Sequence, residues 1–231
     1  MPIRAIVNTA RTLSYYLRLQ EVTSNNLANA NSDAFKADRM TARELPDSAE
    51  PVPVEVTDLS QGALRDTGRP FDVALNGSGF FVVRTPEGER LTRGGSLHLD
   101  ATGRLADAHG NPLLGTQGPV VIDGSRMQVQ PDGSVLSDDS LAGVLRIVDV
   151  DGPQSLLKQG AGLYLSRTPV RDVSQGATTV KQGAVEDANL NTITSMVDLI
   201  TIQRAYSANL EALKAMDGVL SVITNQVGKE S

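Results

Sequence analysis

Two long segments, one at each end of the chain, carry helical periodicity. Near the start, residues of one stripe recur at alternating spacings of three and four, as on one side of a helix. The stripe consists of Ile3, Ile6, Ala10, Leu13, Leu17, Gln20, Ser24 and Leu27. Thr23 to Asn26 then bring in side chains that compete for backbone hydrogen bonds. We therefore expect a helix that ends between this point and Asn31.

A longer helical pattern runs from about Asn189 to about Thr224, with no proline and with Gly218 as its weak point. A helix that lies on one core needs one apolar stripe, and this segment has two, so it predicts neighbours on two sides. Two helices in one chain cannot supply all of those neighbours, which favours self-assembly. The first seam contains Met196, Leu199, Gln203, Tyr206, Leu210, Leu213 and Leu220, and the second contains Ala205, Ala208, Ala212, Met216, Val219 and Ile223.

Between the ends, from about Arg69 to about Thr168, the chain changes to short apolar runs separated by Gly-containing pairs. Asn-Gly and Asp-Gly pairs between apolar runs are strong hairpin signals, because both residues tolerate positive φ. The middle is therefore predicted to be an all-β module. The runs are 71–75, 80–83, 120–122, 127–129, 145–150 and 163–165, and the pairs end at Gly77, Gly88, Gly103, Gly110, Gly124, Gly133 and Gly152.

These patterns predict an α+β fold in which an all-β domain is inserted between two helices that pack as a coiled-coil-like pair. Leu45 to Pro53 carries three prolines and Val170 to Gly183 is polar, so both regions are expected to be linkers. The expected organisation is an N-terminal helical segment at 1–35, an extended linker at 36–68, the all-β domain at 69–170, a second linker at 171–188 and the C-terminal helix at 189–231.

The amino-acid composition argues against several classes of function. Aromatic residues make up 3% of the chain, which disfavours an aromatic-lined ligand pocket or a sugar-binding cleft. A formal net charge of -6 argues against a nucleic-acid partner. No stretch is apolar and long enough for a membrane span or a cleavable secretory signal.

Candidate chemistry is sparse. The chain has no cysteine, and His98 and His109 lack a carboxylate cluster with ligand spacing, so neither a metal nor another cofactor is expected. Asp149 resembles the start of a calcium loop, but Gly160 stands where a bidentate Glu is required. Gly77-Ser78-Gly79 lies between strands and lacks the helix that a phosphate loop or nucleophile elbow needs. We therefore expect no catalytic residues and no enzyme.

Four segments contain motifs that resemble those of the flagellar rod and hook protein family. Their family patterns are Asn-Asn-x-Ala-Asn with Thr-x-Gly-Phe-Lys, then Gly-x-Gly-Phe-Phe, then Thr-Arg after an aromatic, and then the closing helix with the loop that leads into it. The segments are Ser24 to Lys36, Asp72 to Val83, Leu91 to Leu97, and Gln182 to Asn189 continued by Met196-Val197 and Gln203 to Tyr206.

This chain departs from the family pattern in four places. Ser32 stands at the Thr position and keeps the hydroxyl group. Ala34 stands at the Gly position, where a Cβ disfavours a positive φ. Leu91 and Leu97 replace two aromatics.

The resemblance implies a non-enzymatic subunit that is exported through the flagellar type III apparatus and assembles in the periplasm. Its partners would be copies of itself and other rod proteins, with its helices forming the inner tube and its β-domain the outer surface. The run from Gln61 to Gly68 and the compact length are most similar to a proximal-rod subunit. A distal-rod or hook-type subunit is the alternative, and a coiled-coil adaptor outside the flagellum is a further one.

The predicted subunit interface combines residues from the helical seams with residues from the motifs. They are Ile3, Ile6, Ala10, Leu13, Leu17, Asn26, Asn29, Phe35, Met196, Leu199, Gln203, Arg204, Tyr206, Leu210, Leu213, Met216 and Leu220. On the alternative interpretation, the Asn residues only end a helix, and Gln203 and Arg204 lie on a solvated helix face.

Overall fold

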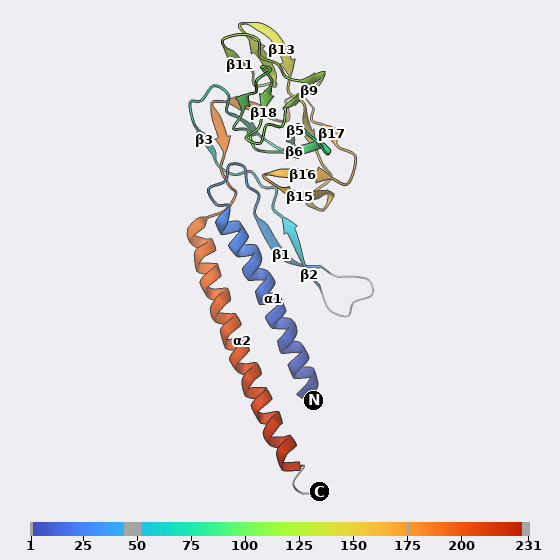
Figure 1. Cartoon of the computed structure of the whole chain (residues 1–231), viewed down its shortest axis with the longest axis vertical. Coiled ribbons are helices and arrows are strands. Elements are labelled where there is room, and N and C mark those ends of the chain that lie inside the picture. The colour runs from blue at the N-terminus through green and yellow to red at the C-terminus, as the bar shows by residue number, and fades with distance from the viewer. Residues whose placement is uncertain (1, 44–51, 175, 228–231) are drawn as a thin grey trace. The chain divides into compact units, whose positions relative to one another are not determined.

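The computed structural model describes residues 2–43, 52–174 and 176–227, and it describes side chains from residue 6 to residue 219 within those ranges. The fold is α+β, with a long helix at each end and many short strands between them (Figure 1). The described residues divide into a helical unit (2–28, 38–43, 52–55 and 191–227) and a β unit (29–37, 56–174 and 176–190).

The helical unit consists of two antiparallel helices and a strand pair. Helix α1 spans Pro2–Ala28 and helix α2 spans Thr192–Val227, and the two lie side by side (Figure 1). A helix at each end of the chain was expected, and this is confirmed. Strand β1, Asp38–Arg43, pairs with β2, Val52–Thr57, and β1 lies against α1.

The start of α2 is fixed by a side-chain cap. The Oδ1 atom of Asn191 accepts a hydrogen bond from the backbone N–H of Thr194 at 3.1 Å, and the Asn191 carbonyl accepts one from Ser195 N–H at 2.9 Å. An Asn at this position satisfies a backbone donor that the helix itself leaves free.

The largest sheet of the β unit has six strands in the order β15-β16-β6-β5-β14-β17. Neighbouring strands in it are antiparallel, and a tight turn joins β5 to β6 so that Thr85 faces Gly88. A short 3-10 helix, Pro153–Ser155, precedes β15. The six strands are β5 Phe80–Thr85, β6 Gly88–Thr92, β14 Ile147–Asp149, β15 Leu156–Gly160, β16 Leu163–Ser166 and β17 Arg171–Asp172.

Smaller sheets complete the β unit. Strands β11, β12 and β13 form a three-stranded sheet, and the remaining strands pair as β7 with β8, β9 with β10, β18 with β4 and β19 with β3. The strands are β3 Leu64–Asp66, β4 Val73–Asn76, β7 His98–Leu99, β8 Leu105–Ala106, β9 Leu114–Gly115, β10 Gly118–Pro119, β11 Met127–Val129, β12 Ser134–Ser137, β13 Ser140–Val144, β18 Thr179–Gln182 and β19 Ala184–Glu186.

Strand β5 lies between two hydrophobic clusters. Successive side chains of a strand point to opposite faces, and here both faces are buried. Phe81 and Val83 belong to one cluster, and Phe80 and Val82 belong to the other. Tyr164 of β16 packs near Phe80, with 5.7 Å between ring centroids.

Five of the six apolar runs contain a strand, as expected. The run 120–122 does not: it forms one isolated bridge, between Val121 and Arg104. Of the seven expected turn glycines, six have positive φ and Gly124 does not. Ala34, whose Cβ was expected to disfavour a positive φ, nevertheless has φ of 56°.

The two regions expected to be linkers contain strands. Residues 36–68 include β1, β2 and β3, and residues 171–188 include β17, β18 and β19. Strand β19 pairs with β3, and β18 pairs with β4. These pairs join the beginning of the β unit to its end, across more than a hundred residues of sequence.

Candidate subunit interface

The expected stripe of α1 is only partly buried. Leu13 is buried and Ile6 is half-buried, whereas Ala10 and Leu17 are exposed. Val22, which the stripe did not include, is buried. The Ile3 side chain lies outside the described residues. The buried face of α1 is therefore rotated from the expected one.

The first seam of α2 is half-covered. Helix α1 lies along α2, and the α2 side chains that lose solvent exposure there centre on Ile202, which the sequence analysis missed. The exposed members are Met196 and Gln203, and the Leu220 side chain is not described. Arg204 and Met216, which the predicted interface also includes, are exposed as well. The half-buried members are Leu199, Tyr206, Leu210 and Leu213.

A second face of α2 leaves large apolar side chains uncovered near the start of the helix. Ile193, Met196, Val197 and Ile200 are between 48% and 75% exposed, and we call these four residues the α2 stripe. Single exposed apolar residues are ordinary, but a contiguous patch of them marks an interaction site or an aggregation risk.

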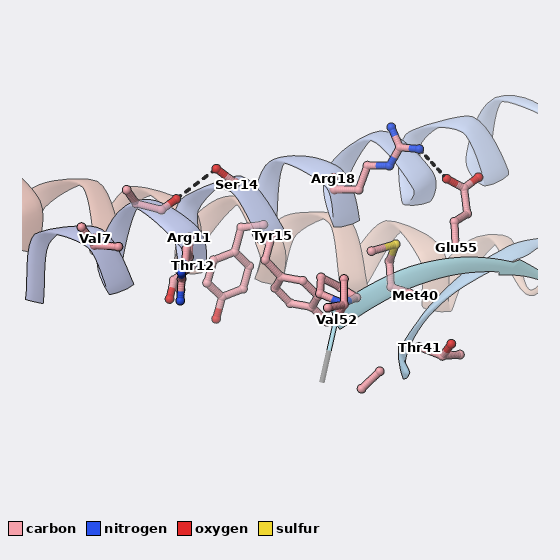
Figure 2. Close-up of a pocket in the computed structure, with 14 residues that line it drawn as sticks. Val7, Arg11, Thr12, Ser14, Tyr15, Arg18, Met40, Thr41, Val52 and Glu55 are labelled. Carbon is pink, nitrogen blue, oxygen red and sulfur yellow. Dashed lines mark hydrogen bonds and ion pairs between the residues drawn. The ribbon is translucent and has the colours of Figure 1, made fainter. Parts of the chain in front are cut away.

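A groove of about 1060 Å³ runs between α1 and the β1–β2 pair within the helical unit (Figure 2). Arg18 crosses to β2, where its Nη2 atom lies 2.9 Å from Oε2 of Glu55, and its Nη1 atom lies 3.2 Å from Glu21. Arg11 also lines the groove. The apolar lining includes Val7, Ala10, Tyr15, Met40, Val52 and Pro53.

The β unit contains a buried ionic cluster built from three of the four motif segments. Lys36 comes from the first motif, Arg93 from the third, and Glu186 from β19 in the last. The Nζ atom of Lys36 lies 2.5 Å from Oε1 of Glu186, and Nη1 of Arg93 lies 3.1 Å from Oε2. All three side chains are almost completely buried.

Backbone groups satisfy most of the remaining polar atoms of this cluster. Lys36 Nζ donates to the Ser60 carbonyl at 2.6 Å, and Arg93 Nη2 donates to the Gly77 carbonyl at 2.7 Å. The N–H of Gly62 donates to Oε1 of the Glu186 carboxylate at 2.9 Å. A Cβ at position 62 would lie 1.9 Å from the Asp187 carbonyl oxygen, so this approach requires glycine.

Burial and ion pairing have opposite effects on the pKa values of the two cations in the cluster. Burial lowers the pKa of the Lys36 ammonium, because desolvation disfavours the charged form, and the hydrogen bond to Glu186 counteracts this. Burial likewise lowers the pKa of Arg93 against the attraction of Glu186. One carboxylate thus compensates two buried cations, so removing it is expected to destabilise the unit.

Motif asparagines hold backbone segments together. Asn26 accepts from Asp38 N–H at 2.9 Å and donates to Asp38 O at 2.8 Å, as a neighbouring strand would. Asn189 accepts from Ala37 N–H at 2.7 Å and donates to the carbonyl of Asp58 at 2.8 Å. Both side chains therefore have a role within the subunit.

The other two interface candidates of the N-terminal motif also have contacts within the chain. The carbonyl of Phe35 accepts a hydrogen bond from Asn189 N–H at 3.2 Å, and the Lys158 ammonium lies 4.7 Å from the Phe35 ring centre. Asn29 is half-buried, and its carbonyl accepts from Ser32 N–H at 3.0 Å. These contacts help to shape the turn that follows α1.

Lys36, Arg93, Glu186 and Asn189 lie within the motifs, but the predicted interface did not include them. The sequence contained a signal for buried charges, because Lys36 and Glu186 each stand directly beside apolar or small residues in otherwise buried segments. The spacing of 150 residues between them gave no reason to pair them.

Among the described residues, no group of three His, Cys, Asp or Glu side chains could hold a metal ion, and His98 and His109 are exposed. No helix in the part of the chain that the structure describes combines the length and the apolar character of a membrane span. The main features of the described residues are the exposed α2 stripe, the groove beside α1 and the buried ionic cluster of the β unit.

Comparison with known proteins agrees with these features. Residues 181–226 match the family described as flagellar basal body rod FlgEFG protein C-terminal, and residues 74–137 match the flagellar hook protein FlgE/F/G D1 domain. The chain is 28% identical to the flagellar basal-body rod protein FlgF of Mesorhizobium japonicum, over 82% of this chain and 83% of that protein. It is 27% identical to FlgF of Escherichia coli, over 92% and 94%. It is 29% identical to the flagellar basal-body rod protein FlgG of Buchnera aphidicola, over 88% and 92%.

Family models match residues 74–137 of the β unit and residues 181–226, which include most of α2, and the relatives span most of the chain. These comparisons define the class: the chain is similar to the flagellar hook and rod proteins. Within this class, the relatives support a rod protein of the FlgF type.

Proposed function

We propose that this chain is a structural subunit of the proximal flagellar rod, and that it assembles through its terminal helices with copies of itself and with other rod proteins. One observation carries the assembly step. Among the described apolar side chains of the helical unit, only Leu13, Val22 and Ile202 are buried, while the α2 stripe, Val7, Leu17 and Val219 are exposed.

Assembly would cover this apolar surface. Each Å² removed from water contributes roughly 25 cal/mol, so a contact of a few hundred Å² per helix is a sufficient driving force. The second face of α2 supports neighbours on a side other than α1, in coiled-coil-like contacts. Repeated contacts between different surfaces, if they do not close into a ring, give a helical filament.

The proposed work of the subunit is mechanical: it transmits torque along a tube and catalyses no reaction. The proposed location is the rod within the periplasmic space, reached through the flagellar export apparatus. The names of the FlgF relatives, which are basal-body rod proteins, support a location in the rod. A distal-rod position is the second candidate, because the FlgG relative matches at 29% identity.

Truncation after Leu190 tests the proposal. It removes α2 but keeps Glu186 and Asn189, whose side chains complete the β unit. In cells that lack the native gene, the full chain should restore swimming, and the truncated chain should not. Purified truncated protein should keep the amide protection of β5 and β6, which would show that the β unit is folded.

Leu141→Ser is the matched control. Leu141 is a large exposed apolar residue of the β unit, and its replacement should leave swimming unchanged. Swimming restored by the chain without α2 would refute assembly through the terminal helices. Rescue of strains that lack FlgG, without rescue of strains that lack FlgF, would favour the distal position.

A further inference from the structure

We propose that the α2 stripe of one copy docks in the groove between α1 and the β1–β2 pair of a second copy. This inference rests on the proposed function and deepens it, because it names both surfaces of one contact. The stripe is exposed, and the groove is hollow and apolar (Figure 2).

The spacing of the stripe suits a groove. Ile193, Met196, Val197 and Ile200 stand at positions i, i+3, i+4 and i+7 of a continuous helix. Helices that lie in grooves present their anchors at these positions. A helix that only faced water would have no reason to place four large apolar side chains on one line.

The groove is long enough for these anchors. Its α1 wall runs from Val7 to Arg18, which corresponds to roughly 16 Å at a rise of 1.5 Å per residue. The α2 stripe spans roughly 10 Å by the same rise. Tyr15 and Met40 both line the groove and offer apolar contacts (Figure 2).

The charges of the two surfaces are complementary. Asp198, which lies beside Val197, is the single charged residue between Asn191 and Ile202. The groove lining contains two arginines, Arg11 and Arg18, and one carboxylate, Glu55, while Arg18 also pairs with Glu21. A docked stripe would bring the Asp198 carboxylate to a wall that carries arginines, which favours one register and one partner over others.

The stripe cannot reach the groove of its own chain. Helix α2 already lies along α1 with the face that contains Leu199 and Ile202, and Ile200 lies on another side. The stripe begins at the second residue of α2, beside the end of α1, whereas the groove begins near the start of α1 (Figure 1). Docking therefore joins two copies displaced along the helix axis, and it can repeat.

Cross-linking tests this contact, because the native chain has no cysteine. Full-length Val197→Cys protein is mixed at high concentration with Tyr15→Cys protein, and a short bismaleimide is added. A heterodimer should form at least fivefold faster than in a matched mixture of Val197→Cys with Leu141→Cys. Asp198→Arg should lower the yield severalfold, whereas Asp217→Arg, a matched exposed acid of α2, should not.

Sedimentation of the wild-type protein separates the outcomes. Polymers without preferential linkage to Tyr15 would overturn the groove contact and leave the proposed function standing. A protein that stays monomeric and unlinked at every concentration would refute the proposal that a second copy occupies the groove. The proposed function would then be judged by the swimming assay of the truncated chain.

Discussion

The two units of this chain differ in how much of their apolar surface they cover for themselves. The β unit buries two clusters, and residues such as Leu75, Phe81 and Val83 have no exposed surface. The helical unit buries three apolar side chains among those described and exposes Ile193 and Val197 by more than half.

The β unit forms its own hydrophobic core, whereas the helical unit does not. The β unit has a core on both faces of β5, a buried ionic cluster and strand pairs that join its first and last segments. It buries a core without a partner, although single apolar residues such as Leu141 stay exposed. The helical unit has two helices but too few faces to cover both sides of α2, so its stable form is expected to involve other subunits.

The largest expected effect tests the completeness of the β unit. Glu186→Ala removes the carboxylate and leaves Lys36 and Arg93 buried without their counter-ion. Breaking a buried ion pair from one side typically costs about 3–5 kcal/mol. We expect the free energy of opening measured by amide exchange in β5 to fall by about that amount.

Lys181→Ala is the matched control for the ion pair. Its ammonium lies 2.5 Å from Asp66, the same separation as in the Lys36–Glu186 pair, but the two side chains are 47% and 73% exposed. An exposed pair contributes less than about 1 kcal/mol. If both variants lost equal stability, burial would not be what makes the cluster important.

A second pair of substitutions compares the units directly. Leu75→Ala leaves a cavity in the β unit and should cost about 2–5 kcal/mol of opening free energy in β5. Leu17→Ala removes the same atoms from a 46%-exposed site in α1, and Ala favours helix, so the monomer should change by less than about 0.5 kcal/mol.

The same Leu17 variant should weaken polymers, which sedimentation would detect. A large loss of monomer stability from Leu17→Ala would show that the helical unit covers its own surface. It would remove the asymmetry on which the proposed assembly depends.

Much of this fold could be predicted from the sequence because its signals are local. The period of α2, the glycines at turns and runs such as Phe80 to Val83 depend on neighbours within a few residues. Strands β3 and β19 could not be predicted in this way. Each has three residues, and each is stabilised by pairing with the other across more than a hundred residues.

The candidate site shows the same limit. The helical period identified Leu13 and Leu199, but it could not tell which face of α1 would meet α2, so Val22 and Ile202 were missed. The ionic cluster was missed because Lys36 and Glu186 meet only through tertiary structure.

The smallest expected effect concerns two alanines in the left-handed region. Ala161 has φ of 53° and is exposed, so Ala161→Gly should relieve strain and stabilise the β unit by about 0.5 kcal/mol. Ala34 has φ of 56° but is buried, and a buried methyl group contributes about 0.8 kcal/mol. Ala34→Gly should therefore be near neutral. The difference in opening free energy between the two variants measures the value of the Ala34 methyl group, and equal stabilisation by both would show that the β unit gains nothing from it.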